Sequence, residues 1–246
     1  MISITALMAF SRFELELFFK TYIAVAFTYI APCMIFGFSV SSQPLDKRPA
    51  ALAAMYPVIL GVIILFVALY TLGTQVVGYR EMGFYKRILI TRIRPVSIAL
   101  SNAIRGFVLV LIGLVILSAE GWLLFGIKPS YNILQSLIAI LFAGGGIFLL
   151  GLIPACFVKR TQSMFAVASI SSYILVFFSG VMPNYGNYFN WMAHVVKFWP
   201  SYHALRVLRA GFAGVLFQPS ILGSMVYLIG LVAVCLLFLR RFLSWM

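Results

Sequence analysis

The sequence predicts an all-α membrane protein with six transmembrane helices. Of its 246 residues, 63% are hydrophobic and only 9% are charged, a balance typical of polytopic membrane proteins rather than of soluble domains. Six apolar stretches reach the roughly twenty residues that a helix needs to cross a bilayer. No long linker or soluble domain separates them, so residues 1–246 are predicted to form one membrane domain. The predicted spans are residues 21–40, 56–78, 98–119, 133–156, 164–182 and 221–239.

The first element is an amphipathic helix ahead of the first span. Arg12, Glu16 and Lys20 follow one another at i,i+4 spacing and line one narrow stripe, and large apolar side chains occupy much of the remaining surface. Glu16 before Lys20 is the favourable order for a helical ion pair. Residues 1–20 are therefore predicted to form an interfacial helix that lies on the membrane surface.

The second charged element, residues 80–95, lies between the second and third spans. Read as a helix that starts at Glu81, it places its apolar and its basic side chains on different faces. Glu81 would occupy the first turn, where the helix dipole favours a negative charge, and Pro95 would end the helix. The apolar face would then pack on the membrane domain and the basic face would meet a cytoplasmic partner. The apolar set is Phe84, Tyr85, Ile88 and Leu89, and the opposite set is Arg80, Gly83, Lys86 and Arg87.

Two later elements depart from a plain apolar span. Gly144, Gly145 and Gly146 lie inside the fourth span and favour close helix packing, with a hinge or a substrate passage as the rarer alternative. Residues 183–212 are broken by prolines, asparagines and glycines, and are rich in aromatic side chains that suit the headgroup level. This segment is predicted to form one or two short half-helices in an external re-entrant segment.

Basic residues set the predicted orientation, because Lys and Arg mark the cytoplasmic side of membrane proteins. With the N-terminus in the cytoplasm, twelve Lys and Arg residues fall on the cytoplasmic side and six fall outside. The chain is therefore predicted to be a multi-pass protein of the cell membrane with both termini, and residues 80–95, in the cytoplasm. The net charge of +13 then reflects topology, and no nucleic-acid partner is expected.

The sequence lacks the residues that ion-coupled transport, ATP hydrolysis, catalysis and metal binding require. None of the five acids lies in the middle of a predicted span, so proton or sodium coupling lacks an intramembrane carboxylate. No phosphate-binding loop, catalytic motif or metal-ligand spacing is present, so the chain is not expected to be an enzyme or to bind a metal or cofactor itself. Arg105 is expected to snorkel to the cytoplasmic surface, with a functional pairing inside the bundle as the alternative. Energy for any work must then come from a partner.

At these motifs the chain resembles the membrane subunits of type-2 ABC exporters. The most specific part is the cytoplasmic segment, which reads Tyr-Arg-Glu-Met-Gly-Phe-Tyr-Lys-Arg-Ile-Leu-Ile-Thr over residues 79–91 and continues to Pro95. The second match is Ser-Gly-Val-Met-Pro over 179–183, followed by Trp191, Pro-Ser-Tyr over 200–202 and Leu-Arg over 205–206. The interfacial helix is the third. Family members usually carry an arginine or a glutamate-rich pair just before the glycine, so Met82 before Gly83 marks a diverged copy.

The resemblance implies a mechanism in which two permease subunits pair and each docks a separate ATPase subunit that holds ATP and Mg. Residues 81–91 would be the coupling helix, and the first, second and fifth spans would line the substrate route. The missing aromatic-tryptophan pattern of the polysaccharide branch favours a drug, peptide or lipid-like substrate. The alternatives are a non-transporting membrane assembly or immunity factor and, least favoured, a membrane-embedded enzyme. The implied docking residues are Arg80, Glu81, Gly83, Phe84, Tyr85, Lys86, Arg87 and Leu89. The candidates for the substrate path are Tyr173, Phe177, Phe178 and Ser179, for which ordinary packing is the competing interpretation.

Overall fold

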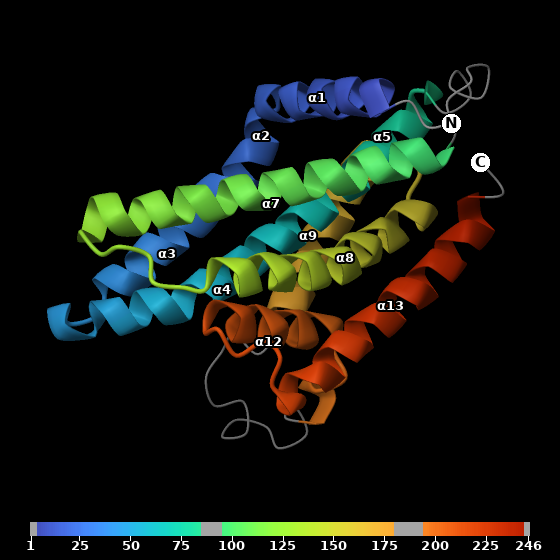
Figure 1. Ribbon diagram of the computed structural model, residues 1–246. Helices are drawn as coiled ribbons and strands as arrows, with labels where there is room; N and C mark the ends of the chain where they lie inside the picture. Colours follow the sequence, from blue (N-terminus) through green and yellow to red (C-terminus); the bar gives the residue numbers. More distant parts are fainter. Residues whose placement is uncertain (1–3, 85–94, 180–193, 244–246) are drawn as a thin grey trace.

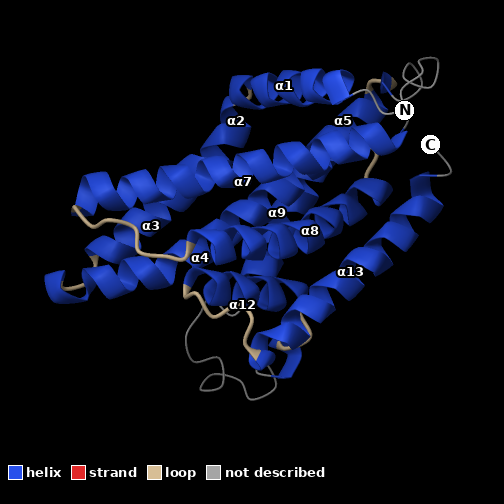
Figure 2. Cartoon of the chain, in the orientation of Figure 1, coloured by secondary structure: helices blue, strands red, loops and turns tan. Residues whose placement is uncertain are grey.

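The computed structural model describes residues 4–84, 95–179 and 194–243, and these residues form helices and no strand (Figures 1 and 2). The all-helical prediction is confirmed. Most of the predicted coupling helix, with Tyr85, Lys86, Arg87 and Leu89, lies outside the described residues, as does most of the first half of the external segment. The helices are α1 (Ile4–Lys20), α2 (Tyr22–Val25), η1 (Ala26–Ile30), α3 (Ala31–Ser41), η2 (Leu45–Lys47), α4 (Arg48–Phe66), η3 (Val67–Gly73), α5 (Thr74–Glu81), α7 (Pro95–Phe125), α8 (Ile133–Phe157), α9 (Thr161–Phe177), α12 (Pro200–Phe212) and α13 (Pro219–Leu243).

Each predicted span falls on a helical stretch of the described chain. Four helices are long and apolar enough to cross a membrane, namely Leu45–Glu81, Leu100–Phe125, Ile133–Phe157 and Pro219–Leu239. The stretches Ala26–Ser41 and Thr161–Phe177 are apolar but shorter. The helix that contains the second predicted span begins before it, because the alanine-rich start of α4 is helical as well. The helix that contains the third continues beyond it, so Glu120 lies within α7.

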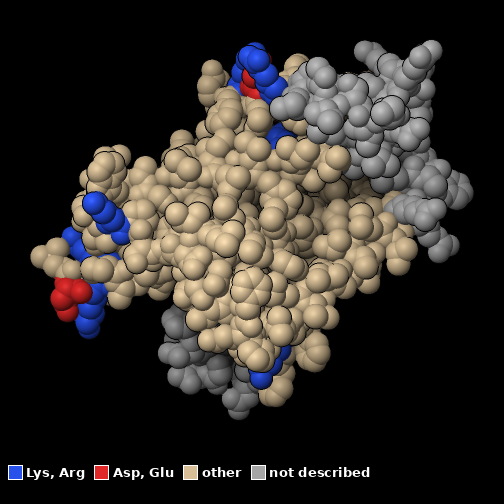
Figure 3. All heavy atoms as spheres, in the orientation of Figure 1, with Lys and Arg blue, Asp and Glu red and all other residues tan. Residues whose placement is uncertain are grey.

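The core is organised around α4. Its residues Tyr56 to Leu60 and Val62 to Leu65 are buried on every side, and a helix that is apolar all round is one that is buried all round. Helices α3, α7, α8 and α12 pack against it. On the face shown in Figure 3, the charged side chains of the described residues lie at the margins and a wide uncharged surface separates them. This distribution fits a protein surrounded by lipid.

The glycines of α8 allow a close helix contact, as the sequence predicts. A β-carbon added at Gly144 would lie 2.8 Å from the ring of Phe107 in α7, closer than real β-carbons approach. Any larger residue at this position would push α7 and α8 apart. Close helix packing, the favoured interpretation of the glycine run, is therefore confirmed for Gly144.

Helix α12 lies in the second half of the segment predicted to be external. It begins at Pro200, a residue that suits the first turn because it lacks an amide hydrogen, and the preceding Trp199 is extended. One face, which includes Leu205, Leu208 and Phe212, is buried against α4, α8 and α13. Thirteen residues are too few to cross a bilayer, so α12 packs against the bundle without spanning it.

Candidate functional site

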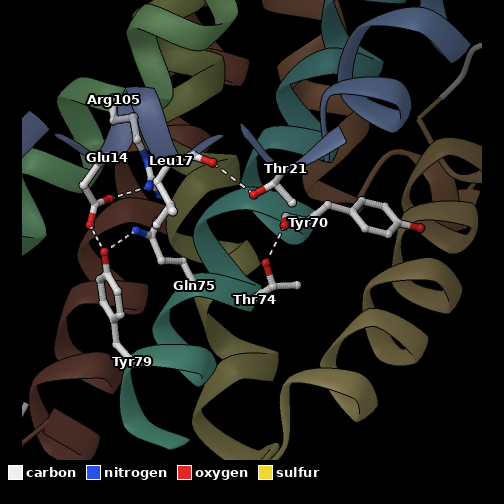
Figure 4. A network of polar contacts seen from close by, with 8 residues as sticks. All are labelled: Glu14, Leu17, Thr21, Tyr70, Thr74, Gln75, Tyr79 and Arg105. Atoms are coloured by element: carbon white, nitrogen blue, oxygen red, sulfur yellow. Dashed lines mark hydrogen bonds and ion pairs between the residues drawn. The ribbon is translucent and has the colours of Figure 1, made fainter. Parts of the chain in front are cut away.

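A buried ion pair joins α1 to α7 (Figure 4). A guanidinium nitrogen of Arg105 donates to one carboxylate oxygen of Glu14, and the Tyr79 hydroxyl of α5 donates to the other. Gln75 donates its amide hydrogen to the Tyr79 oxygen at 2.7 Å. Glu14 and Arg105 are only 1% and 2% exposed, so each charge is shielded from water and is balanced by the other, while Nε and Nη2 of Arg105 have no hydrogen-bond partner. Three helices therefore meet at one carboxylate.

The expectation that Arg105 snorkels to the surface is wrong, and the alternative of a pairing inside the bundle is correct. The sequence analysis also missed Glu14. The signal lies in the spacing of α1, because the buried residues Ser11, Glu14 and Phe18 recur every three or four positions. They form the face opposite the predicted polar stripe, so an acid occupies the inward face of an amphipathic helix.

The polar stripe of α1 is exposed, as expected for Arg12, Glu16 and Lys20. The ion pair on it differs from the expected one. Arg12 lies 3.3 Å from Glu16, and these side chains are 83% and 56% exposed. An exposed pair of this kind contributes little to stability, about 1 kcal/mol at most.

The predicted helix start at Glu81 is wrong, because Glu81 is the last residue of α5. The amide of Met82 bonds to the Gly78 carbonyl at 3.0 Å, and that of Gly83 to the Arg80 carbonyl at 3.1 Å. Gly83 then adopts a φ of +67°, in the left-handed region that glycine reaches without steric cost. The sequence pattern of an acid near a glycine thus marks a helix end rather than a helix start. Phe84, the last described residue before 95, is helical again.

Arg80 and Glu81 hold the turn between α8 and α9. Arg80 donates to the carbonyl of Ala155 at 3.0 Å and to that of Val158, at the C-terminus of α8, where carbonyls lack helical partners. Glu81 accepts hydrogen bonds from the Thr161 amide at 2.9 Å and from its hydroxyl at 2.6 Å, at the N-terminus of α9. A cation at a C-terminus and an anion at an N-terminus both complement the helix dipoles.

The pKa of Glu81 reflects this position. The hydrogen bond from the Thr161 hydroxyl and then that from its amide hold the pKa of the Glu81 carboxyl below its usual value, and the charge of Arg160 adds to the effect. Glu81 therefore stays ionised at neutral pH and caps α9 from a neighbouring helix. The N-cap residue of α9 itself, Arg160, provides no side-chain cap.

Tyr79 extends the network toward the coupling segment. Its ring stacks on Phe84, with centroids 4.4 Å apart and an interplanar angle of 29°. Tyr79, Arg80 and Glu81, which we call the α5 hub, thus contact Glu14 of α1, the end of α8 and the start of α9. Through Phe84 the hub also touches the first residue after the glycine turn. These contacts use Arg80 and Glu81 within the chain, and their predicted docking role remains a prediction.

The family is decided by a comparison with known protein families. The model of the ABC-2 type transporter matches residues 5–213, which include α1, the α5 hub and α12. The chain belongs to the ABC-2 type transporter family. No curated protein matches it at a significant level. As an ABC-2 membrane domain it is a permease of an ABC transporter, so the predicted type-2 permease identity is confirmed.

The four substrate-path candidates of this ABC-2 permease do not converge on one site. Tyr173 and Phe177 are 76% and 42% exposed on the outer surface of α9. Phe178 instead packs on Trp199, with ring centroids 4.9 Å apart. Ser179 is buried and donates its hydroxyl hydrogen to the Val176 carbonyl at 2.6 Å. Only the first two are placed to meet a second permease subunit or lipid.

Tyr70, which the sequence analysis did not single out, joins the three spans that the resemblance assigns to the substrate route. Its ring stacks on Phe27 of η1 at 5.7 Å, and its hydroxyl donates to Ser169 of α9 at 2.9 Å. Tyr70 itself lies in η3, one of two π-helical turns in the described chain, and such turns are frequent at functional sites. An aromatic residue in an apolar span gives no sequence signal of such a role.

No metal site is found among the described residues, since nowhere do three His, Cys, Asp or Glu side chains gather. The cysteines Cys33, Cys156 and Cys235 are unpaired thiols within apolar helices.

Proposed function

We propose that this ABC-2 permease is the membrane subunit of an ATP-driven exporter that moves a drug-like, peptide or lipid-like substrate out through the cell membrane. It pairs with a second permease subunit, identical or related, and each permease docks a separate ATPase subunit. That ATPase subunit binds ATP and Mg. The permease crosses the membrane six times, with both termini in the cytoplasm.

The observation that carries the proposal is the α5 hub at the start of the coupling segment. A docking segment can transmit force only if it is fixed to the helices that must move. Tyr79, Arg80 and Glu81 are consecutive, yet they bond to α1, α8 and α9, and Glu14 continues the connection to α7. A displacement of residues 82–95 would therefore be transmitted to four other helices, α1, α7, α8 and α9. The side-chain contacts that transmit it start from three consecutive residues of α5.

The hub also explains which motions would follow. Closure of the two ATPase subunits would push the coupling segment toward the membrane, and Gly83 would serve as the joint between it and α5. Arg80 and Glu81 would carry the ends of α8 and α9 along as a rigid unit, because both bonds lie at helix termini. Tyr79 would pull on Glu14, and so on the interfacial helix. Packed elements of this kind move as rigid bodies between discrete arrangements.

The arrangement of the helices supports the orientation. In Figure 1 the first turn of α1, the end of α5, the start of α7 and the end of α13 all lie toward the same end of the bundle. The turn from α8 to α9 joins this end, since Arg80 and Glu81 bond to it. With that end in the cytoplasm, the two shorter apolar helices each complete a crossing, and the membrane passes total six.

The test is co-purification of an ATPase subunit from native membranes, followed by substrate-stimulated ATP hydrolysis in liposomes. The variant carries Lys86→Glu and Arg87→Glu, and the matched control carries Arg12→Gln and Lys20→Gln, two exposed cations of α1. Loss of the ATPase in the first variant alone supports docking through the coupling segment. Full transport by a permease with residues 81–91 scrambled would overturn the proposal. A partner that co-purifies with no solute movement would favour the non-transporting assembly or immunity factor.

A further inference from the structure

A cavity of about 320 Å³ lies between the end of α9, α12 and the start of α13. Its described lining residues include polar side chains, two of them cations, and apolar side chains. The lining residues are Ser179, Tyr202, Arg206 and Arg209 on the polar side and Leu205, Ala210, Val215 and Ile221 on the apolar side.

The two arginines are arranged on one face of α12. Arg206 and Arg209 are three positions apart, so their side chains are neighbours on the helix surface. Arg206 donates to the Ser220 carbonyl at 2.8 Å, which holds its guanidinium over the cavity. Arg209 also lines a second cavity, of about 660 Å³, between α4 and the loop before α8. Arg209 therefore lines both cavities.

The charged residues that line the two cavities among the described residues are all cations. No described Asp or Glu lines either cavity. Ser179 donates its hydrogen to Val176, so the other polar side chains among the lining residues are Tyr202, Arg206 and Arg209. A cation in the last turn complements the dipole of α12 and accounts for Arg209 alone. The helix dipole does not account for Arg206, nor for the apolar side chains that line the cavity beside the two arginines.

We propose that this cavity binds the anionic head group of an amphiphile, with a phosphate or carboxylate between Arg206 and Arg209 and the hydrocarbon part over Leu205, Val215 and Ile221. The planar guanidinium fork matches the oxygens of phosphate and carboxylate in geometry and charge. The backbone beneath it is fixed, because Ser201 bonds to the Leu175 carbonyl at 2.7 Å and ties α12 to α9. The site requires no ATPase subunit.

The test uses the full-length permease in nanodiscs of phosphatidylglycerol or phosphatidylcholine, and counts retained lipids by native mass spectrometry. The variant is Arg206→Gln with Arg209→Gln. The matched control is Lys128→Gln with Lys197→Gln, two exposed lysines that do not line the cavity. Retention of phosphatidylglycerol is expected to weaken about tenfold for each guanidinium removed, with no change for phosphatidylcholine or in the control.

Two further arms keep the result interpretable. Arg206→Lys keeps the charge, and Arg209→Gln alone leaves the bond to Ser220 in place, so a folded protein is available even where the double variant is unstable. Inorganic phosphate is titrated into delipidated protein in detergent and the melting temperature is followed. Equal retention of phosphatidylglycerol by the double variant and the unmodified protein would overturn the proposal. Stabilisation by inorganic phosphate as strong as that by phosphatidylglycerol would overturn the amphiphile assignment.

Discussion

Glu14 and Arg105 are 91 positions apart in the chain, yet they form an ion pair that is almost fully enclosed between α1 and α7. Two charges are rarely placed in such surroundings, because removing them from water costs several kcal/mol for each ion unless they are paired. The pair therefore fixes how the interfacial helix sits on the bundle. Because Tyr79 shares the same carboxylate, the position of α1 is linked to the end of α5.

The first prediction concerns this pair. Replacing Arg105 by Ala leaves Glu14 buried without its cation, and the permease is expected to lose about 3–5 kcal/mol of stability. Replacing both residues, with Glu14→Gln and Arg105→Met, removes both charges and is expected to recover much of that loss. The measurement is thermal unfolding in detergent. The exposed pair provides the control, and Arg12→Ala with Glu16→Ala is expected to change stability by less than about 1 kcal/mol. Equal effects at the two pairs would contradict the role of burial.

The second prediction separates the two contacts of Tyr79. Tyr79→Phe keeps the ring against Phe84 but removes the hydroxyl that binds Glu14 and Gln75. We expect a modest loss of stability, about 1–3 kcal/mol, and a clear drop in substrate-stimulated ATP hydrolysis. Tyr22→Phe is the control, since Tyr22 is 84% exposed. Unchanged stimulation in Tyr79→Phe would show that the interfacial helix takes no part in transmission.

The third prediction uses a matched pair of glycines. Gly83 and Gly126 both have a φ of +67°, and neither has a neighbour within 4 Å of an added β-carbon. Alanine at either position therefore introduces the same backbone strain, about 1–2 kcal/mol, and no steric clash. Only Gly83 lies between α5 and the coupling segment. We expect Gly83→Ala to reduce ATPase coupling and Gly126→Ala to leave it intact, at equal expression. Equal loss in both would point to stability alone.

The fourth prediction concerns the cap on α9. Glu81→Gln and Thr161→Val each remove part of the same interaction from opposite sides, and each is expected to cost about 1 kcal/mol. In a double-mutant cycle the two effects should not add, because the residues share their bonds. Glu81→Lys places a cation at the N-terminus of α9 and is expected to disrupt coupling while membrane insertion persists. Additive effects, measured by thermal unfolding, would contradict a shared cap.

The fifth prediction is a pH dependence from His203 of α12. Its Nε2 donates to the Lys197 carbonyl at 2.8 Å, and Nδ1 lies 3.1 Å from the Ser224 hydroxyl and accepts its hydrogen. Burial lowers the pKa of His203, and the charge of Arg206 adds to this. The unfolded chain therefore binds the proton more readily than the folded chain. Stability is complete above the unfolded pKa of about 6.5 and falls as the pH drops through the folded value.

The check for His203 is the melting temperature between pH 7.5 and pH 5.5. The unmodified permease is expected to lose stability on acidification over this range. His203→Gln keeps a donor but cannot titrate, so its melting temperature should fall less steeply. Parallel curves for the two proteins would assign the acid sensitivity to other groups.

The sequence by itself determined the class of the molecule and the positions of its apolar helices. Composition and the length of apolar runs suffice for this, because a bilayer requires long apolar helices whatever their neighbours are. The exposed stripe of α1 follows from local periodicity, and the short helix α12 follows from the prolines, asparagines and glycines that interrupt the apolar run. Helical spacing tells which side chains share a face, and this information lies within a few residues.

Only the tertiary structure decided what those faces meet. Glu14 lies on the inward face of α1 by its spacing, but nothing within α1 names Arg105 or Tyr79 as its partners. Glu81 was predicted to start a helix and instead ends one, at the left-handed turn of Gly83. Its carboxylate is satisfied by Thr161, 80 positions away. Buried charges must find partners wherever the packing of helices places them. The partners of the α5 hub are therefore set by the fold, and local sequence does not contain them.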